Sequence, residues 1–190
     1  MLQGIEDITD VTIHCSATRY GVENDIDDIE EWHAPRHFPS YKDGDRVMHV
    51  GYHLIILVDG TLQFARPFTS VGAHVKGQNF GNVGICMIGG LGKSGRPKED
   101  GFLNQQYDCL YETLWSMRAP QHPLYLPNLV RIKGHRDHSP DMNGDGLITR
   151  EEWLKDCPCF DVDTFLVRNG LAQYKVPSYV DEDKLLNLRR

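Results

Sequence analysis

The chain has 190 residues and a formal net charge of −7, with 40% hydrophobic and 25% charged residues. This length and composition predict one soluble globular domain with enough apolar side chains for a single core. No block of Lys or Arg runs along the chain, which argues against a general nucleic-acid binder or a protein held at an anionic membrane, because both need a positive surface. We therefore expect neither nucleic acid nor a membrane as a partner.

The first ten residues are acidic and lack the basic stretch and apolar run of a secretory signal. No stretch approaches the roughly 20 apolar residues of a membrane span. We therefore expect a protein that is made in a cytoplasm without a signal peptide. The five cysteines are an odd number, which disfavours a disulfide framework and leaves metal binding by a thiolate as an alternative use.

The predicted elements alternate between short strands and amphipathic helices. Strands are expected at 11–14, 52–58, 61–64, 82–88 and 129–133, and helices at 24–32, 103–117 and 161–168. Asp59 and Gly60 form the hairpin turn between two of the strands, Asn24 or Asp25 can cap the first helix, and Gly170 ends the last. This order predicts an α/β fold in which one central mixed sheet is flanked by helices, with residues 1–190 as a single domain.

Three candidate metal ligands lie far apart in the sequence, namely His14, His135 and Cys157. Both histidines stand where a predicted strand ends, so side chains from separate strands can converge at the rim of the sheet. Two imidazoles and one thiolate suit a tetrahedral zinc ion, and three protein ligands leave the fourth position to water, as in catalytic sites. Spacing alone leaves two alternatives: a strand-end histidine is commonly a hydrogen-bonded structural residue, and Cys159 can replace Cys157.

Seven short segments stand out along the chain. They are His-Cys-Ser-Ala-Thr at 14–18, Gly-Tyr-His at 51–53, Asp-Gly-Thr at 59–61, Gly-Ala-His-Val-Lys-Gly-Gln-Asn at 72–79, Val-Gly-Ile-Cys at 83–86, Gly-His-Arg-Asp at 134–137 and Cys-Pro-Cys-Phe-Asp at 157–161. In this order they resemble the type-2 N-acetylmuramoyl-L-alanine amidase and peptidoglycan-recognition-protein family, above all the short amidase endolysins of bacteriophages. The resemblance covers about residues 9–168.

The resemblance implies a zinc-dependent amidase that cuts bacterial peptidoglycan between N-acetylmuramic acid and the L-alanine of the stem peptide. It implies zinc held by His14, His135 and Cys157, and it favours Cys157 over Cys159. Zinc acidifies a bound water to a pKa of roughly 7 and polarises the carbonyl, which addresses the poor reactivity of an amide.

The same resemblance implies catalytic roles for Tyr52 and Lys155, which can donate to the negatively charged oxygen of a tetrahedral intermediate. Either residue can also supply the proton that the departing amine needs. Without the resemblance, Tyr52 is as simply a core residue and Lys155 a solvated one. His74 and Asn79, in the 72–79 segment, are expected to shape the substrate groove rather than to bind metal.

Residues 141–152 match the twelve-residue EF-hand calcium loop, with Gly146 at the sharp turn. The expected calcium ligands are Asp141, Asn143, Asp145, Leu147 (through its carbonyl) and Glu152. Pro140 disfavours an entering helix, so we expect an isolated loop of weak affinity, inserted between two zinc ligands and directly before Lys155. Calcium is then a switch or a staple for the site. The alternative is a surface turn rich in Asp, Asn and Gly that binds no metal.

The sequence therefore predicts an endolysin that acts as a monomer, is made in a host cytoplasm and cuts the wall from the periplasm after release, which lyses the cell. One rival is a non-catalytic peptidoglycan-binding module, which usually lacks the metal cysteine that this chain has at Cys157. A second is a cytoplasmic amidase that recycles muropeptide fragments. A regulatory contact with a host or phage protein is a further role on which the sequence is silent.

Overall fold

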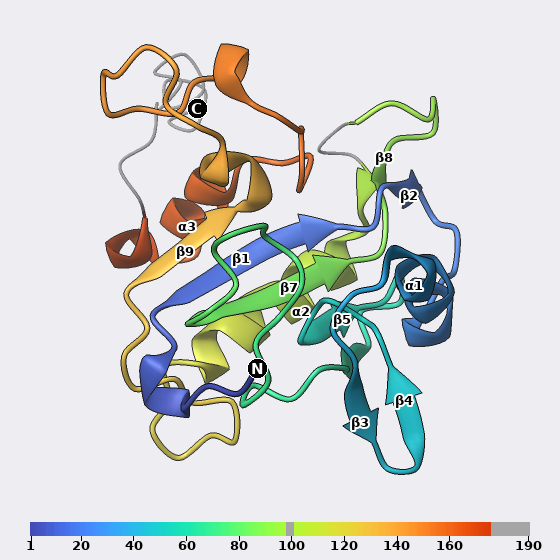
Figure 1. Ribbon diagram of the computed structural model, residues 1–190. Coiled ribbons are helices and arrows are strands. Elements are labelled where there is room, and N and C mark those ends of the chain that lie inside the picture. Colours follow the sequence, from blue (N-terminus) through green and yellow to red (C-terminus); the bar gives the residue numbers. More distant parts are fainter. Residues whose placement is uncertain (98–100, 176–190) are drawn as a thin grey trace.

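The computed structural model describes residues 1–97 and 101–175, and a mixed five-stranded sheet lies at its centre (Figure 1). The strand order is β6-β5-β7-β1-β9, in which β6 alone is antiparallel to its neighbour. The strands are β1 (Asp10–Cys15), β5 (Leu54–Ile56), β6 (Leu62–Phe64), β7 (Asn82–Met87) and β9 (Arg131–Gly134). The α/β class expected from the sequence is confirmed. Residues 98–100 and 176–190 of the predicted domain lie outside the described residues.

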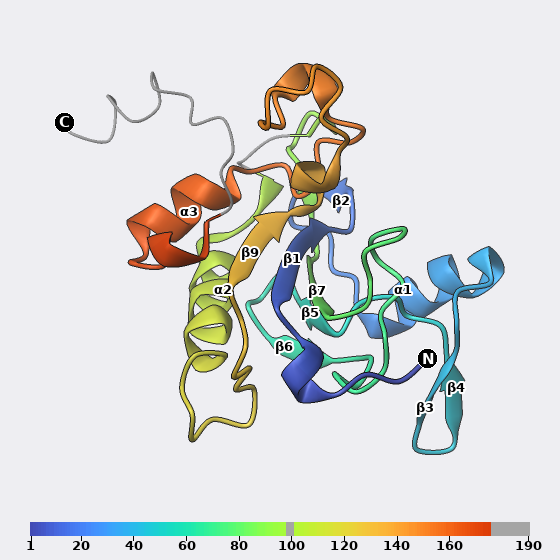
Figure 2. The ribbon, with the colours of Figure 1, turned by 60° about the vertical axis from the view of Figure 1, so that its left-hand side comes forward.

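Helices cover both sides of this sheet (Figure 2). The helices α2 (Asn104–Ser116) and α3 (Val162–Arg168) pack on one face, and α1 (Ile26–His33) lies towards the other. Asp25 and Asp161 cap α1 and α3, because their carboxylates accept backbone N–H groups of the first turn. The three predicted helices are confirmed to within two residues at each end. None of the helices in the described ranges is long and apolar enough to cross a membrane.

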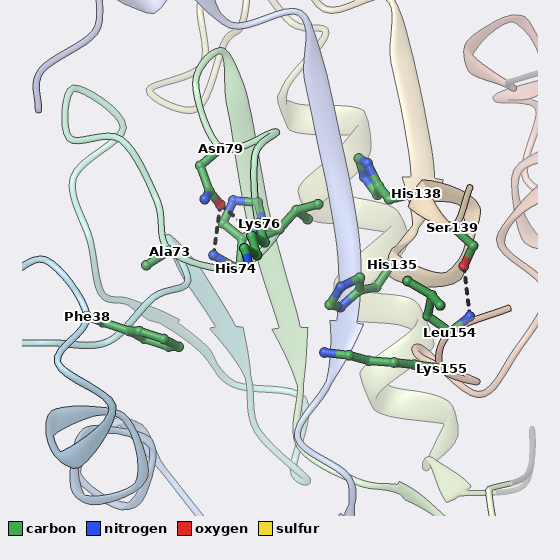
Figure 3. A pocket seen from close by; sticks show the side chains of 11 residues that line it. Phe38, Ala73, His74, Lys76, Asn79, His135, His138, Ser139, Leu154 and Lys155 are labelled. Carbon is green, nitrogen blue, oxygen red and sulfur yellow. Dashed lines mark hydrogen bonds between the residues drawn. The ribbon is translucent and has the colours of Figure 1, made fainter. Parts of the chain in front are cut away.

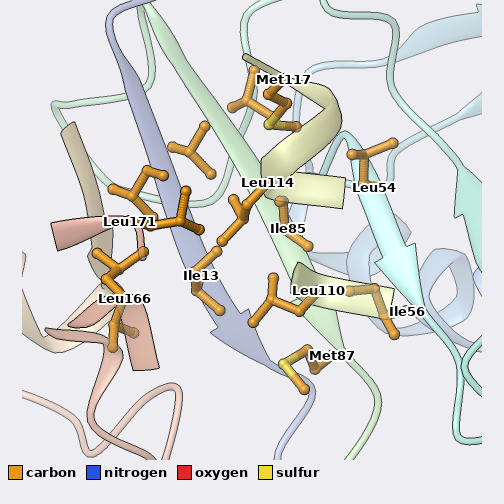
Figure 4. Packing of buried hydrophobic residues seen from close by; sticks show 14 of the residues in the cluster. Ile13, Leu54, Ile56, Ile85, Met87, Leu110, Leu114, Met117, Leu166 and Leu171 are labelled. Atoms are coloured by element: carbon orange, nitrogen blue, oxygen red, sulfur yellow. The ribbon is translucent and has the colours of Figure 1, made fainter. Parts of the chain in front are cut away.

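Strand residues alternate between the two faces of the sheet. The main core joins one face to α2 and α3 (Figure 4) and includes Val11, Ile13, Ile85, Met87, Leu110, Leu114 and Leu166. On β1, this alternation sends Val11 and Ile13 into the core and turns Thr12 and His14 to the opposite face. His14 thus ends on the face that α2 and α3 do not cover.

The shorter elements are less visible in the sequence. A hairpin of β3 (Tyr41–Asp43) and β4 (Arg46–Met48) and a parallel pair of β2 (Thr18–Arg19) and β8 (Gly90–Leu91) are present although neither was expected. The predicted strand at 52–58 is regular only over β5, and at its far end Leu57 already belongs to the turn around Gly60. The 3₁₀ turns are η1 (Ile5–Asp7), η2 (Ala34–Arg36), η4 (His135–His138), η5 (Arg150–Glu152) and η6 (Ala172–Tyr174).

Candidate active site

His14, His135 and Cys157 converge at one edge of the sheet, although His14 and Cys157 are 143 residues apart in sequence. The strands β1 and β9 are parallel neighbours, and Ile13 is aligned with Gly134. His14 follows Ile13 and His135 follows Gly134, so the two histidines lie at the same edge of the sheet. One donor atom of each side chain lies within 4.8 Å of the other two, and the described residues hold no second group of this kind. The three side chains form a site that is able to hold a metal ion.

The geometry of these donors fits one tetrahedral ion. His14 Nδ1 lies 4.0 Å from Cys157 Sγ, and two donors that each sit about 2.0–2.3 Å from one ion are roughly 3.5 Å apart. The ring centroids of His14 and His135 are 4.6 Å apart. The backbone N–H of Cys15 donates to Cys157 Sγ at 3.3 Å, which helps to hold the sulfur in place beside the histidines.

Cys159 is not part of this cluster. Its side chain belongs to the main core, and its Sγ lies 3.5 Å from Cys15 Sγ. The hydrogen bond with Cys15, together with burial, holds the pKa of the Cys159 thiol above its ordinary value. Of the two candidate cysteines, the structure therefore brings only Cys157 to the histidines.

Both histidines of the cluster are neutral at physiological pH. Burial lowers the pKa of His14 well below its ordinary value, and the neighbouring imidazoles add to this effect. Burial, followed by the nearby Lys155 ammonium, lowers the pKa of His135 to about 4. A metal binds neutral imidazole, so no proton has to be removed from either ring at neutral pH.

Tyr52 and Lys155 line the same pocket as His135 and Cys157. The Tyr52 ring centroid is 5.0 Å from that of His14, and burial raises the pKa of the phenol, which stays protonated and can donate. The Lys155 side chain runs beside His135 and points its ammonium group into the groove (Figure 3). Both groups are suited to stabilise negative charge that develops on an oxygen.

The groove continues past His135 into a cavity of about 560 Å³, a size typical of small-molecule sites. Phe38 and Leu154 lie on opposite sides of it, with His74 and Asn79 between them (Figure 3). The groove therefore offers apolar walls around a polar floor.

His74 and Asn79 line this cavity and also have partners inside the protein. Asn79 Oδ1 accepts hydrogen bonds from the backbone N–H groups of His74 and Val75 at 2.9 and 2.8 Å. The His74 ring is buried, and its Nδ1 lies 3.0 Å from His14 Nε2. The sequence indicated the groove for both residues, but no feature of its spacing pointed to the contact between His74 and His14.

Residues 141–152 form a mostly exposed loop whose carboxylates bind its own backbone. Asp141 accepts from the N–H groups of Gly144 and Gly146 at 2.7 and 2.8 Å, and Glu152 accepts from that of Met142 at 2.8 Å. The acidic side chains of this part of the described chain do not gather into a metal-sized group. The calcium site that the sequence indicates therefore stays a prediction.

The base of this loop is closed by contacts that do not involve its acidic residues. The backbone N–H of Leu154 donates to Ser139 Oγ at 3.0 Å. The Arg136 guanidinium lies 4.0 Å from the ring centroid of Trp153 and pairs with Asp161 at 2.8 Å. These contacts hold the two ends of the insertion together, on the elements that carry His135 and Cys157.

Comparison with known proteins gives relatives along most of the chain. The chain is 32% identical to the endolysin of Enterobacteria phage K11 over 160 residues, which cover 84% of this chain and 86% of that protein. It is 48% identical to an uncharacterized protein of Haemophilus influenzae over 109 residues, 57% of this chain and 88% of that protein. No protein-family model matches.

Solved structures share the fold. The N-acetylmuramoyl-L-alanine amidase LysC from Clostridium intestinale URNW has a TM-score of 0.60 at 20% identity, over 90% of this chain and 91% of that one. The peptidoglycan recognition protein PGRP-SA of Apis mellifera has a TM-score of 0.61 at 15% identity, over 91% and 87%. Identities this low show a common fold, with one mixed sheet and few helices.

Proposed function

The chain belongs to the family of the phage K11 endolysin, and from this premise we propose that it is a peptidoglycan hydrolase of the N-acetylmuramoyl-L-alanine amidase type. The proposed target is the amide bond between N-acetylmuramic acid and the L-alanine of the stem peptide. The observation that carries the proposal is the convergence of His14, His135 and Cys157 beside a groove. Folds shared with amidases and with peptidoglycan recognition proteins support the same substrate class.

The proposed cofactor is zinc. Two imidazole nitrogens and one thiolate sulfur are ligands that zinc prefers, and three protein ligands leave one position open. When bound, the ion would supply an acidified water and a polarised scissile carbonyl. His14, His135 and Cys157 would hold it, and the neutral state of both rings supports this assignment.

Tyr52 and Lys155 are the proposed catalytic residues. Negative charge develops on the carbonyl oxygen as the amide is attacked, and a phenol and an ammonium group can both donate hydrogen bonds to it. The departing L-alanine amine takes up a proton, and both Tyr52 Oη and Lys155 Nζ carry one. Their place on the lining of one pocket with His135 and Cys157 supports these roles.

The groove is the proposed binding site for the junction of glycan and peptide. His74 and Asn79 lie on its polar floor, and Phe38 and Leu154 offer apolar surface on either side. Sugar rings and short peptides present both apolar faces and hydrogen-bonding groups, so a groove of this mixed character suits them.

We also propose that residues 141–152 bind calcium, which calls for the carboxylates to turn from the backbone amides towards the ion. The left-handed backbone of Gly146, with φ of 86°, supplies the sharp turn that an EF-hand loop needs at its sixth position. The proposed ligands are Asp141, Asn143, Asp145, Leu147 and Glu152.

The proposed setting is that of an endolysin. The protein is made in the cytoplasm of an infected cell, acts as a monomer and reaches peptidoglycan in the periplasm after release, which lyses the cell. Homology to the phage K11 endolysin supports this setting.

Digestion of purified Gram-negative sacculi, followed by mass spectrometry of the products, tests the proposed reaction. The expected products carry new free L-alanine amino groups and no new reducing sugar ends. New reducing ends would indicate a glycosidase. Cleavage of soluble fragments alone would indicate a recycling amidase, and binding to sacculi without cleavage would indicate a recognition module.

A further inference from the structure

His74 contacts the candidate metal ligand His14, in addition to lining the groove. Its imidazole is buried and packs edge-on against His14, with ring centroids 5.0 Å apart and an interplanar angle of 87°. A third imidazole, that of His53, packs edge-on against His74, with ring centroids 5.7 Å apart. We propose that His74 is a positioning residue, which fixes the nitrogen through which His14 binds the metal; this inference rests on the proposed metal site.

Hydrogen bonds run from His14 to His74 and from His74 to Asn82, and the Asn82 carbonyl determines which atoms donate. The carbonyl oxygen of Asn82 lies 3.2 Å from His74 Nε2 and can only accept. His74 Nε2 therefore carries the proton, and the neutral ring offers a lone pair at Nδ1. His14 Nε2 lies 3.0 Å from this lone pair and donates to it.

The consequence appears at the other nitrogen of His14. With the proton on Nε2, the Nδ1 atom is unprotonated, and it is this atom that lies 4.0 Å from Cys157 Sγ. A metal binds only the unprotonated nitrogen, whereas a neutral imidazole without a fixed partner exchanges between two tautomers. His74 therefore selects the tautomer that faces Cys157 and holds the ring in that orientation.

The surroundings of His74 are shaped to hold its ring in this place. A Cβ atom at Gly72 would lie 2.4 Å from His74 Cδ2, and one at Gly84 would lie 2.7 Å from His74 Cγ. Neither glycine has a positive φ, so these positions need the small residue rather than its backbone freedom. The backbone N–H of the same histidine donates to Asn79 Oδ1 at 2.9 Å, which fixes the backbone at this position.

The first test needs no variant. Long-range ¹H–¹⁵N correlation spectra of the wild-type protein, labelled at histidine, report which ring nitrogen carries the proton. In the metal-free protein we expect the Nε2–H tautomer for His14 and for His74. A His14 ring that is protonated at Nδ1, or that exchanges freely between the two forms, would overturn the proposal.

Two variants of His74 then separate positioning from packing. His74→Leu keeps the bulk but removes both nitrogens, and we expect mixed tautomers of His14 with zinc affinity reduced about 10–100-fold, as for other partners of metal-binding histidines. His74→Asn restores an acceptor near the position of Nδ1 and is expected to recover most of the affinity. Zinc affinity is measured by competition with a chelator, independently of turnover.

The outcomes are distinct for the two proposals. Unchanged tautomer and unchanged zinc affinity in folded His74→Leu would reduce His74 to a packing residue. If this variant does not fold, the wild-type spectra decide. A wild-type protein that binds no zinc would remove the proposed function, and with it any metal for His74 to serve, whereas a wrong tautomer in a zinc-binding protein would remove this inference alone.

Discussion

Asp10 and Arg131 form a bidentate ion pair across the two strands that lead to the site. Arg131 Nε and one terminal nitrogen each donate to a carboxylate oxygen of Asp10 at 2.7 Å. The two residues are aligned partners in the β1–β9 register, and the same register aligns Ile13 with Gly134. The ion pair therefore fixes, at one end of the strands, the alignment that places His14 beside His135 at the other.

Asp10→Asn is expected to lower the free energy of unfolding at pH 7 by roughly 1–2 kcal/mol, because a buried carboxylate is lost from a half-exposed arginine. Burial works to raise the pKa of Asp10, but the hydrogen bonds from Arg131 outweigh it and hold the pKa below the ordinary 3.8. The stabilisation is thus present above pH 4 and is lost as the pH falls through the lower folded value. Denaturant unfolding at pH 7 and pH 3 measures both effects.

A suitable control is Asp27→Asn, which breaks the exposed pair with Arg46. We expect it to cost clearly less than Asp10→Asn, because an ion pair between exposed side chains contributes little to stability. Equal losses for the two variants would mean that the Asp10 pair does not guide the register.

Cys157→Ser and Cys159→Ser are expected to differ in metal content. Cys157 Sγ belongs to the donor cluster, so its loss should release most of the zinc. Cys159 is a core thiol, so its replacement should lower stability while zinc remains close to one ion per chain. Elemental analysis of both purified proteins decides, and a zinc-free Cys159→Ser protein that is folded would reverse the assignment.

Tyr52→Phe and Lys155→Ala are expected to keep zinc and to lose turnover by roughly 10²–10³ each, since donors to a developing negative charge act only in the transition state. Turnover on sacculi and zinc content are measured on the same samples. Tyr41→Phe and Lys42→Ala are matched controls, because the Tyr41 hydroxyl has no hydrogen-bond partner and Lys42 is exposed on β3. Turnover of the test variants at the level of these controls would return Tyr52 and Lys155 to structural roles.

His53 is expected to make the metal-free protein sensitive to mild acid. Its ring is fully buried, with hydrogen bonds at 3.0 Å to the Ser70 carbonyl and from the Gly84 N–H. Burial lowers the pKa of His53 from 6.5 to about 4. Between these two pH values the unfolded chain therefore binds a proton at His53 that the folded chain does not bind. The stabilisation is full above pH 6.5 and is lost as the pH falls towards 4, at about 1.4 kcal/mol per pH unit for one group.

Urea unfolding between pH 7 and pH 4.5 measures this slope. His53→Asn keeps an acceptor for Gly84 without a titrating group, and its slope should be smaller. His37→Asn, at an exposed position with φ of 55°, should leave the slope unchanged. A slope that is the same in all three proteins would assign the acid sensitivity to other groups.

Calcium is expected to raise the melting temperature while turnover stays constant. The base of the 141–152 loop is already closed by Ser139 and Leu154, so ordering of its tip should add stability without moving His135 or Cys157. A ligand that binds the folded state alone stabilises it by mass action. Calcium is titrated with zinc saturating, and turnover and melting temperature are followed together.

Glu152→Gln should abolish the thermal response, whereas Glu151→Gln, at the neighbouring exposed position, should retain it. Turnover that rises with calcium occupancy would make the loop a switch. The absence of any response would remove calcium from the account.

The apolar runs of the sequence predict where two of the three candidate metal ligands lie. Buried strands at 11–14 and 129–133 each lead to a polar residue, and parallel strands bring such ends to one edge of a sheet, which placed His14 and His135. The sequence does not indicate the hairpin of β3 and β4, because its residues are mainly exposed and lack an alternating apolar pattern. The apolar run at 52–58 continues into a turn, so the regular strand is shorter than the run predicts.

The periodic pattern of apolar residues does not predict contacts between loops. His74 reaches His14 across 60 positions only because two glycines leave room for its ring, and no local pattern encodes that fit. The choice between Cys157 and Cys159 depends on the path of an irregular segment, in which side chains do not alternate predictably. The family resemblance favoured Cys157, and the geometry supplies the reason.

The central position of β1 has a consequence for when this protein becomes able to act. The sheet partners of β1 are translated well after the strand itself, because Asn82 follows Thr12 by 70 positions and Arg131 follows Asp10 by 121 positions. At roughly 5–20 residues per second, the 143 positions between His14 and Cys157 take roughly 7–30 s to translate. A nascent or prematurely terminated chain that stops before Cys157 thus lacks a complete donor set.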